Sequence, residues 1–494
     1  MTTIDVLFPE VIGTINPNLY GHFSEHIGGV IYGGIWVGED SAVPNVNGFR
    51  TELVERFRRL RPPVLRWPGG CFAETYDWRD GIGPPAARPV TANWWYNWDG
   101  RLESNRVGTH EFVKFCRLVG ARPYFAANGT STTPLAVRDW IEYCNFPRGS
   151  TTLARRREEN GDPEPFGVEY WGLGNENWGG GGNMTPETYG AAFRNYAMVA
   201  SSVGRGCKFI ACGPSDRDVS WTRRFLEAFF APGHPGSAAN LHGLSMHYYC
   251  GTAGEATSFS QDQWYELLAK ALTMEELVVR HRAAMDTYDP ERRVGLVVDE
   301  WGCWHRDGSG PSRGANLFEQ QSTMRDALVA AMTLGIFNRH CDKVVMANVA
   351  QLVNNLHSLF LAQDGFLVAT PNYHVFDMMK DHQGAQSVRT VVQTGRIGEV
   401  DEVTASCSVQ ADAALLTLVN ARYSDPVEVA VHLHGGAFAG PVSRTVLTAE
   451  PAACNTFAAP DAVCPRGDAL TASGCRLVQS LPAASVTCLR FGRS

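Results

Sequence analysis

Two glutamates follow or close apolar segments, at positions where a carboxylate could do chemistry. Glu176 comes directly after the run at 170–175, within GLGNENWGG, and Glu300 closes the run at 295–300. Burying a carboxylate costs free energy unless a partner stabilises it, so each position calls for an explanation. Two carboxyl groups that face each other can cleave a glycosidic bond, because one protonates the departing oxygen while the other attacks the sugar or positions a water. The pair therefore indicates glycoside hydrolysis.

Eight short apolar runs, separated by segments with helical periodicity, are the elements that would position these glutamates. Strands alternating with helices predict an α/β fold with a parallel sheet, and eight such units predict a closed (β/α)8 or TIM barrel. The runs span 19–23, 64–67, 123–128, 170–175, 208–213, 244–249, 295–300 and 343–348. Glu176 then ends the fourth strand and Glu300 the seventh, so we expect them to face each other across the barrel mouth.

The polar residues that follow these runs are the informative ones, because the active site of such a barrel lies where strands end in loops. A ring of polar side chains at successive strand ends is hard to explain by packing. Its members are Glu25, Arg66, Asn175 with Glu176, His247 with Tyr249, Glu300, and Gln351 or Asn354.

Tryptophans gather near the same strand ends and loops. Indole faces can stack on the C–H face of a sugar while their N–H groups donate to hydroxyls, so these residues agree with a sugar ligand. Several are expected in the core instead, above all Trp67 and Trp301. The set comprises Trp67, Trp78, Trp94, Trp95, Trp98, Trp178, Trp301 and Trp304.

The pattern changes after about residue 385. Segments that alternate at period two, between turns rich in Pro, Gly and Asp, replace the helical periodicity. They predict a C-terminal antiparallel β-sandwich, jelly-roll-like, over 386–494. The strand-like start, 1–18, is expected to join that sandwich, which leaves 19–385 for the catalytic barrel.

Composition and termini limit the partners and the compartment. The 494 residues are 44% hydrophobic and 19% charged with a net charge of −8, which gives no positive field for nucleic acid or an anionic membrane. We find no signal-peptide pattern and no run of about 18 apolar residues. The 13 cysteines are scattered without a CxxC pair and suit reduced thiols. Together these features predict a cytoplasmic protein.

Other chemistries have weaker support in the sequence. The histidines never show HExxH spacing, so HFSEH at 22–26 is interpreted as polar lining rather than a metal site. There is no GxSxG elbow and no Walker motif, and GxGxxW at 172–178 lacks the third glycine of a dinucleotide site. We therefore expect neither a metal nor a cofactor.

Long stretches resemble one enzyme family. The chain resembles the retaining α-L-arabinofuranosidases of glycoside hydrolase family 51, which belong to a clan of (β/α)8 glycosidases with catalytic glutamates on strands four and seven. The similar stretches are YGHFSEHIGGVIYGG (20–34), LRWPGGCFAETYDWRDGIGP (65–84), GTHEFVKFCRLVGA (108–121), GLGNENWG (172–179), SMHYY (245–249), VVDEWGCW (297–304) and ATPNYHVFDMMKDHQ (369–383).

The resemblance implies roles for individual residues. Glu176 in GNE would be the acid/base, Glu300 in DEWG the nucleophile, and Asn175 a hydrogen-bonding partner of the sugar 2-hydroxyl. Tyr249 would lie beside the nucleophile with His247 nearby. The pocket for the non-reducing furanose would be lined by Glu25, Arg66, Cys71 and Trp304.

One stretch departs from the family pattern. Many relatives carry a glutamine that contacts the sugar in the loop after strand eight, where this chain reads VNNLHSLFLA. His357, Asn354 or Asn355 are the alternatives for its replacement. Such a change is compatible with a pocket for galactofuranose or another pentofuranose.

The leading prediction is an exo-acting retaining α-L-arabinofuranosidase that releases terminal arabinofuranose from arabinan- or arabinoxylan-type oligosaccharides by double displacement. An endo-glucanase or xylanase of the same clan would keep the machinery and change the substrate. A sugar-binding module on this scaffold is the non-enzymatic alternative, although a lectin does not require an acid opposite a nucleophile. The resemblance also implies a homo-oligomer, such as a hexamer.

Overall fold

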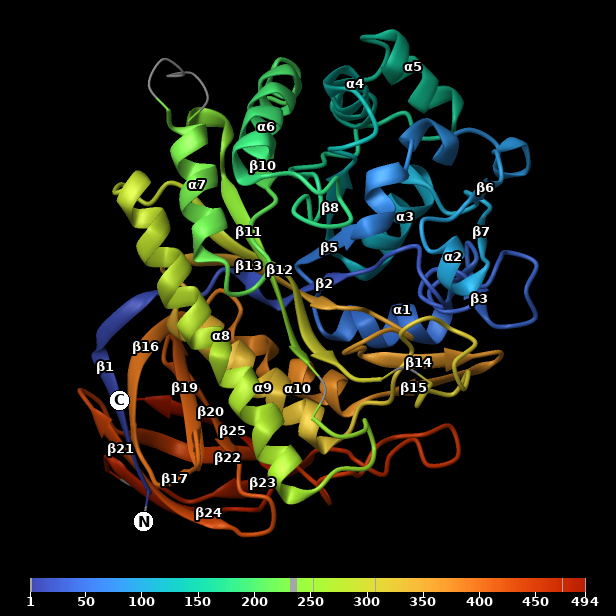
Figure 1. The fold of residues 1–494 in the computed structure, drawn as a ribbon. Helices are drawn as coiled ribbons and strands as arrows, with labels where there is room; N and C mark the ends of the chain where they lie inside the picture. Colours follow the sequence, from blue (N-terminus) through green and yellow to red (C-terminus); the bar gives the residue numbers. More distant parts are fainter. Residues whose placement is uncertain (1, 232–237, 252, 307, 473, 494) are drawn as a thin grey trace. The chain divides into compact units, whose positions relative to one another are not determined.

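Eight parallel strands close into a barrel at the eight places where the sequence predicts them (Figure 1). They follow one another around the ring in chain order, so the predicted (β/α)8 barrel is confirmed. The strands are β2 (Gly21–Phe23), β5 (Val64–Trp67), β8 (Arg122–Ala127), β9 (Tyr170–Leu173), β10 (Lys208–Ala211), β11 (Gly243–Gly251), β12 (Gly295–Trp304) and β13 (Val344–Ala350).

The computed structural model describes residues 2–231, 238–251, 253–306, 308–472 and 474–493. They fall into two units, each treated by itself below. The N-terminal unit comprises Gly21–Tyr248 and Val279–Glu300. The C-terminal unit comprises Met1–Tyr20, Tyr249–Val278 and Trp301–Ser494.

Helices occupy the segments with helical periodicity, and their local sequences explain where they begin. For α4, Pro134 fits the first turn and the Thr133 hydroxyl accepts a hydrogen bond from the Ala136 N–H. The helices are α1 (Thr51–Arg59), α2 (Tyr96–Asp99), α3 (Thr109–Val119), α4 (Pro134–Asn145), α5 (Thr152–Glu159), α6 (Pro186–Ser201), α7 (Val219–Phe229), α8 (Gln261–Tyr288), α9 (Met324–Arg339) and α10 (Pro371–Met379).

Short elements lie in the loops after the barrel strands and between two strands of the C-terminal segment. The 3-10 turn Cys71–Thr75, which follows β5, carries residues of the site described below. Four two-stranded hairpins join β3 (Asn45–Val46) to β4 (Phe49–Arg50), β6 (Thr91–Ala92) to β7 (Leu102–Glu103), β14 (Phe360–Gln363) to β15 (Phe366–Ala369), and β17 (Arg396–Ile397) to β18 (Val400–Asp401).

The C-terminal strands form one continuous nine-stranded sheet, in the order β23-β22-β25-β20-β19-β16-β1-β21-β24. The first strand of the chain, β1, pairs antiparallel with β16 and parallel with β21, and the other neighbours are antiparallel. The strands are β1 (Thr2–Thr14), β16 (Gln386–Gln393), β19 (Val403–Gln410), β20 (Ala413–Asn420), β21 (Val427–His434), β22 (Phe438–Thr448), β23 (Arg466–Leu470), β24 (Arg476–Leu481) and β25 (Ser485–Arg493).

One apolar core holds this sheet together. Alternate residues of several strands contribute to it, among them Ile4 and Val6 of β1 and Val429 and Val431 of β21. The period-two pattern after residue 385 thus marks strands whose one face is buried. The predicted C-terminal antiparallel domain is confirmed, with its strands joined in a single sheet.

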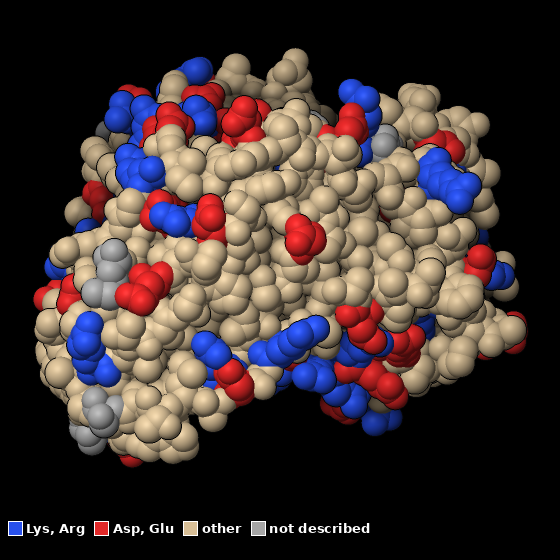
Figure 2. Space-filling model, turned by 90° about the horizontal axis from the view of Figure 1, so that it is seen from below, with Lys and Arg blue, Asp and Glu red and all other residues tan. Residues whose placement is uncertain are grey.

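Charged side chains and cysteines are distributed as follows. Acidic and basic side chains lie intermixed on the face seen in Figure 2, which presents no extended basic area. All 13 cysteines are free thiols. Among the described residues, no helix combines the length and apolar character that crossing a membrane requires.

Candidate active site

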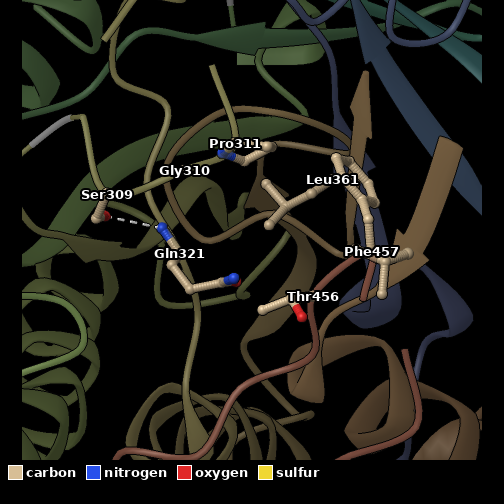
Figure 3. A pocket seen from close by; sticks show the side chains of 8 residues that line it. Ser309, Gly310, Pro311, Gln321, Leu361, Thr456 and Phe457 are labelled. Atoms are coloured by element: carbon tan, nitrogen blue, oxygen red, sulfur yellow. Dashed lines mark hydrogen bonds between the residues drawn. The ribbon is translucent and has the colours of Figure 1, made fainter. Parts of the chain in front are cut away.

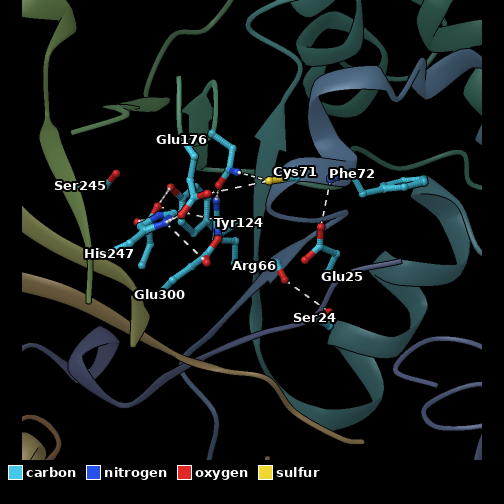
Figure 4. A network of polar contacts seen from close by, with 12 residues as sticks. Ser24, Glu25, Arg66, Cys71, Phe72, Tyr124, Glu176, Ser245, His247 and Glu300 are labelled. Atoms are coloured by element: carbon cyan, nitrogen blue, oxygen red, sulfur yellow. Dashed lines mark hydrogen bonds and ion pairs between the residues drawn. The ribbon is translucent and has the colours of Figure 1, made fainter. Parts of the chain in front are cut away.

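The two glutamates singled out by the sequence come together in the N-terminal unit (Figure 4). Glu176 stands in the loop after β9, and Glu300 lies in β12. One carboxylate oxygen of each, together with a ring nitrogen of His247, lie within 4.8 Å of one another. The Glu176 side chain is 21% exposed, whereas the Glu300 side chain is 8% exposed. The pair is therefore close, and one member is reachable from solvent.

His247 of β11 joins the two carboxylates. Its Nδ1 lies 2.8 Å from Glu176 Oε1 and 3.5 Å from Glu300 Oε2, and its Nε2 lies 3.0 Å from Asp299 Oδ1. Burial alone would lower the pKa of His247, but Glu300, Asp299 and Glu176 raise it to about 10. At neutral pH the ring is therefore an imidazolium that donates from both nitrogens to carboxylates.

Arg66 of β5 holds the nucleophile candidate and the neighbour of the acid candidate at once. Its Nη1 donates to Glu300 Oε1 and its Nη2 donates to Asn175 Oδ1, both at 2.7 Å. The guanidinium also lies over the ring of Phe23, 4.6 Å from its centroid. Because the fork of donors is rigid, Arg66 fixes the Glu300 carboxylate and the Asn175 amide relative to each other.

Asp299 and Tyr124 belong to the same network, and the sequence analysis missed both. Tyr124 donates its hydroxyl to Asp299 Oδ2 at 2.9 Å, and Arg66 Nε lies 3.6 Å from that oxygen. Burial would raise the pKa of Asp299, but Arg66 and His247 lower it to about 2. The acidic pair Asp299–Glu300 at the end of a strand was the available signal; Tyr124, inside an apolar run, gave none.

Glu25 and Cys71, which the resemblance implies as lining of a sugar pocket, both lie near the carboxylate pair. Glu25 Oε1 accepts hydrogen bonds from the Phe72 N–H at 3.0 Å and from Trp95 Nε1 at 3.2 Å. Burial and the nearby Glu300 raise the pKa of Glu25 to about 7. The Cys71 thiol lies 3.9 Å from Glu176 Oε2. Both residues therefore lie beside the Glu176–Glu300 pair.

The backbone around Glu176 takes an unusual path. Glu176 has a φ of +44°, in the left-handed region that disfavours a side chain. Gly174, two residues earlier, has a φ of +99°. A Cβ atom on Gly181 would lie 1.8 Å from the carbonyl oxygen of Asn175, so the glycine-rich loop folds back onto this turn.

Tyr249 and Trp304 belong to the C-terminal unit and contact each other there. Tyr249 lies in β11 and Trp304 ends β12, and their ring centroids are 5.1 Å apart in an edge-to-face arrangement. Trp304 also packs against Phe318, with centroids 4.9 Å apart, and remains partly exposed. The two rings form an aromatic surface at the ends of adjacent strands.

The loop after β13 begins with a glutamine. Gln351 directly follows Ala350, the last residue of β13, so this chain does carry a glutamine at that strand end. Asn354 uses both ends of its amide on the backbone of Ala362, and Asn355 donates to the carbonyl of Leu317 at 3.0 Å. The amides of both asparagines thus hold backbone in place.

His357 is completely buried in the C-terminal unit. Its ring lies 5.9 Å from that of Trp301, and its Nδ1 lies 3.9 Å from Asp326 Oδ1. Burial lowers the pKa of His357 to about 4, which keeps the ring neutral. These surroundings are those of a core histidine.

The tryptophans divide into core and loop residues. Trp67 stacks on Phe112 with centroids 4.9 Å apart and Trp78 stacks on Trp140 at 6.3 Å, both deeply buried. Trp98, in contrast, is 60% exposed and touches Trp95, which donates to Glu25. Trp78 is therefore a core residue, whereas Trp95 lies beside the Glu25 carboxylate.

In two groups of described residues, the possible ligand atoms lie close enough together to hold a metal ion. The groups are Glu176 with His247 and Glu300, and Cys303 with His305 and Asp326. In the first group, the short distances between these atoms are those of the ion pairs that His247 forms with the carboxylates. In the second, His305 Nε2 lies 2.8 Å from Asp326 Oδ1, while Asp326 Oδ2 accepts from the Thr323 N–H at the start of α9. Both oxygens of Asp326 in the second group therefore take part in hydrogen bonds.

A separate hollow of about 170 Å³ lies in the C-terminal unit (Figure 3). Within it, the Gln321 N–H donates to the Ser309 hydroxyl at 2.9 Å. Its lining consists of Ser309, Gly310, Pro311, Gln321, Leu361, Val368, Thr456 and Phe457. With no acid, base or thiol among them, the lining is not suited to acid–base chemistry.

Comparison with known families covers most of the chain. Residues 56–263 match the family described as Alpha-L-arabinofuranosidase 1 domain, and residues 299–485 match the one described as Alpha-L-arabinofuranosidase C-terminal domain. The chain is 38% identical to the Intracellular exo-alpha-L-arabinofuranosidase of Bacteroides ovatus over 464 residues, which is 91% of this chain and 88% of the relative.

Solved structures share the whole fold. The GH51 arabinofuranosidase from Xanthomonas axonopodis pv. citri is 37% identical, with a TM-score of 0.93 over 99% of both chains. The α-L-arabinofuranosidase of Thermotoga maritima, solved as an arabinose complex, is 29% identical with a TM-score of 0.88, again over 99% of both chains. These similarities include the barrel and the nine-stranded sheet.

Proposed function

The chain belongs to the α-L-arabinofuranosidases of glycoside hydrolase family 51, and from this premise we propose a retaining, exo-acting enzyme. It is a glycoside hydrolase, and its proposed substrates are arabinan- or arabinoxylan-type oligosaccharides with terminal arabinofuranose. Glu300 is the proposed nucleophile and Glu176 the proposed acid/base. The Bacteroides ovatus relative, whose name includes both "intracellular" and "exo", supports action on oligosaccharides inside the cell.

The short distance between the two carboxylates carries the proposal of retention. Retaining glycosidases hold their carboxyl groups about 5–5.5 Å apart, while inverting enzymes need roughly 6.5–9.5 Å to admit a water between carboxylate and sugar. Oxygens of Glu176 and Glu300 lie within 4.8 Å of one another. This spacing favours direct attack by one carboxylate over attack by a water between the two.

In the first step, Glu300 bonds to the anomeric carbon as the bond from that carbon to the leaving oxygen breaks. The proton of Glu176 passes to the leaving oxygen, so the aglycone departs as a neutral alcohol. Arg66, which donates to Glu300 Oε1, keeps this oxygen fixed and leaves Oε2 as the attacking atom. Such alignment before reaction lowers the barrier.

In the second step, Glu176 takes a proton from a water whose oxygen attacks the anomeric carbon and releases Glu300. The configuration is inverted twice and so retained. His247 contacts both carboxylates, and as an imidazolium it stabilises negative charge on whichever of them is ionised. Asn175, held by Arg66, is the proposed partner of the sugar 2-hydroxyl.

The stereochemistry of the first-formed product tests this proposal. The enzyme is mixed with an aryl α-L-arabinofuranoside in an NMR tube, and the anomeric signals are followed before mutarotation. We expect α-arabinofuranose to form first. Early β-product would show inversion, and absence of turnover together with tight binding of arabinose would favour a sugar-binding module.

A second measurement addresses the mode of action. Linear arabino-oligosaccharides and arabinoxylan are digested, and the products are separated over time. Release of arabinose alone supports the exo mode, whereas early appearance of longer fragments would support the endo-glucanase or xylanase alternative. The homo-oligomer implied by the family resemblance is a further prediction, for light scattering to test.

A further inference from the structure

Glu74 is a buried carboxylate of the N-terminal unit that the mechanism above does not use. It lies in the 3-10 turn Cys71–Thr75 that follows β5, and it is 1% exposed. Nothing in its local sequence marks it as functional, since it follows no apolar run. Its contacts, however, reach the loop that carries Glu176.

Three donors from two other strand ends meet the Glu74 carboxylate. Oε1 accepts hydrogen bonds from the Asn175 backbone N–H and from Asn177 Nδ2, the latter at 3.4 Å. Oε2 accepts from the Gly129 N–H at 3.0 Å. Glu74 therefore ties the loop after β5 to the ends of β8 and β9 and bonds to the residues on both sides of Glu176.

The backbone that Glu74 holds is the one that aims the acid/base. The peptide N–H of Asn175 immediately precedes Glu176, whose φ of +44° is sparsely populated for a residue with a side chain. Such a conformation persists only where the surroundings fix it. Asn177 adds a second restraint, because its Nδ2 also donates to the Gly181 carbonyl at 2.7 Å.

A carboxylate suits this position better than its amide would. Each Glu74 oxygen accepts from a backbone N–H, and a glutamine has only one oxygen. Its NH2 group would face the N–H of either Asn175 or Gly129, and that buried donor would lose its acceptor. The shape of the side chain would stay, while one anchor of the loop would be lost.

We propose that Glu74 is a positioning residue for the acid/base: it anchors the Asn175 backbone and the Asn177 side chain, on either side of Glu176, so that the Glu176 carboxyl points at the leaving oxygen. This inference rests on the proposed function, in which Glu176 donates the proton. Glu74 itself touches neither carboxylate of the reacting pair in the contacts described above. Its effect must therefore pass through Asn175 and Asn177.

The test compares Glu74→Gln with wild type on two substrates, one with a poor alkyl leaving group and one with an activated dinitrophenyl group. Misaimed acid catalysis slows only the substrate that needs protonation. We expect kcat/KM to fall about ten- to hundredfold for the alkyl glycoside, which is a part of the ~10²–10⁴-fold that general acid catalysis contributes. For the activated glycoside we expect kcat/KM to fall less than about threefold. Equal losses on both substrates, or no loss, would overturn the proposal.

Glu103→Gln is the matched control. Glu103 is as deeply buried in the same unit, but it bonds to His26, Tyr32 and the Asn105 N–H, none of which belongs to the Glu176 loop. A general loss of packing would affect both substrates alike, so this variant should show no dependence on the leaving group. The same dependence in Glu103→Gln and Glu74→Gln would also contradict the proposal.

Two further variants keep the outcome decisive. If Glu74→Gln does not fold, Glu74→Asp retains the charge but is too short to reach both N–H groups, and the same substrate dependence is expected. Glu176→Ala separates the two hypotheses: if it lacks leaving-group dependence, the proposed function fails. If it shows the dependence and the Glu74 variants do not, only the positioning role fails.

Discussion

The molecule contains two clusters of buried titratable side chains. One lies around His247 in the N-terminal unit and the other around His305 in the C-terminal unit. They contain similar residues in different electrostatic surroundings. Around His247, three carboxylates meet two cations, and Glu176 is partly open to solvent. Around His305, a single carboxylate, Asp326, also caps α9, and every member is enclosed. Composition alone would not tell them apart.

A buried histidine beside the carboxylates differs in charge state between the two: His247 in the first cluster and, next to the second, His357, whose Nδ1 lies 3.9 Å from Asp326 Oδ1. In the first cluster, neighbouring carboxylates outweigh burial and raise the pKa of His247 to about 10. Next to the second, burial outweighs Asp326 and lowers the pKa of His357 to about 4. The first cluster combines excess anionic charge with cations that balance it and a carboxylate open to solvent, whereas the second cluster is closed off from solvent.

Removing the proposed nucleophile should have the largest effect. Glu300→Ala is expected to lower kcat by more than about 10⁴-fold, the scale seen when the attacking group of an enzyme is lost. Added azide should restore turnover of an activated glycoside and give a glycosyl azide of opposite anomeric configuration, detectable by NMR. Turnover at the wild-type rate would exclude the assignment of Glu300.

Removing the proposed acid should have a smaller effect that depends on the substrate. Glu176→Ala is expected to slow substrates with poor leaving groups by ~10²–10⁴-fold and to affect dinitrophenyl glycosides far less in the glycosylation step. Pre-steady-state rates on both substrates measure this. Equal losses would mean that Glu176 is not the acid.

The acid of the second cluster should matter for stability alone. Asp326→Ala leaves the Thr323 N–H and His305 Nε2 without their buried acceptor, so we expect the free energy of unfolding to fall by about 1–3 kcal/mol. The kcat/KM per folded molecule should remain within about threefold, as measured with active-site titration. The matched change Asp299→Ala should instead reduce kcat/KM, because Asp299 orients His247. A similar loss of kcat/KM in both variants would contradict the distinction between a catalytic and a structural cluster.

His247 and His357 should give stability profiles of opposite sign with pH. His247 has a folded pKa of about 10, above the ordinary 6.5, so its contribution is complete below pH 6.5 and is lost as pH rises toward 10. His357 has a folded pKa of about 4, below 6.5, so the unfolded chain takes up the proton first and stability falls as pH drops from 6.5 toward 4.

Denaturant unfolding at several pH values checks both signs. His247→Gln should lose less stability than wild type between pH 7 and pH 10, and His357→Gln should lose less between pH 7 and pH 4.5. Parallel profiles for wild type and both variants would mean that neither histidine is coupled to folding in the way its surroundings indicate.

Much of the fold follows from local pattern. All eight barrel strands begin and end close to the predicted apolar runs, because a strand buried on both faces needs a continuous apolar segment and a polar stop. The period-two segments after residue 385 likewise became strands. Their arrangement in one sheet, with β1 between β16 and β21, depends on pairing across nearly the whole chain and has no local signal.

The candidate site divides in the same way. The positions of Glu176, Glu300, Arg66 and His247 near strand ends were predictable, since each lies in or directly after an apolar run. Trp78 shows the limit of this reasoning: a tryptophan near a strand end stacks on Trp140 in the core just as well as on a sugar.

The sequence by itself determined which carboxylates are candidates for the chemistry, because residue type and position near a strand end can be read from the chain. Only the tertiary structure decided what surrounds them. Tyr124 meets Asp299 across 175 residues, and Glu74 accepts from backbone N–H groups 55 and 101 residues away. Every residue type except proline carries such an N–H, so no sequence pattern identifies a particular backbone donor. Its partner is known only from the folded structure.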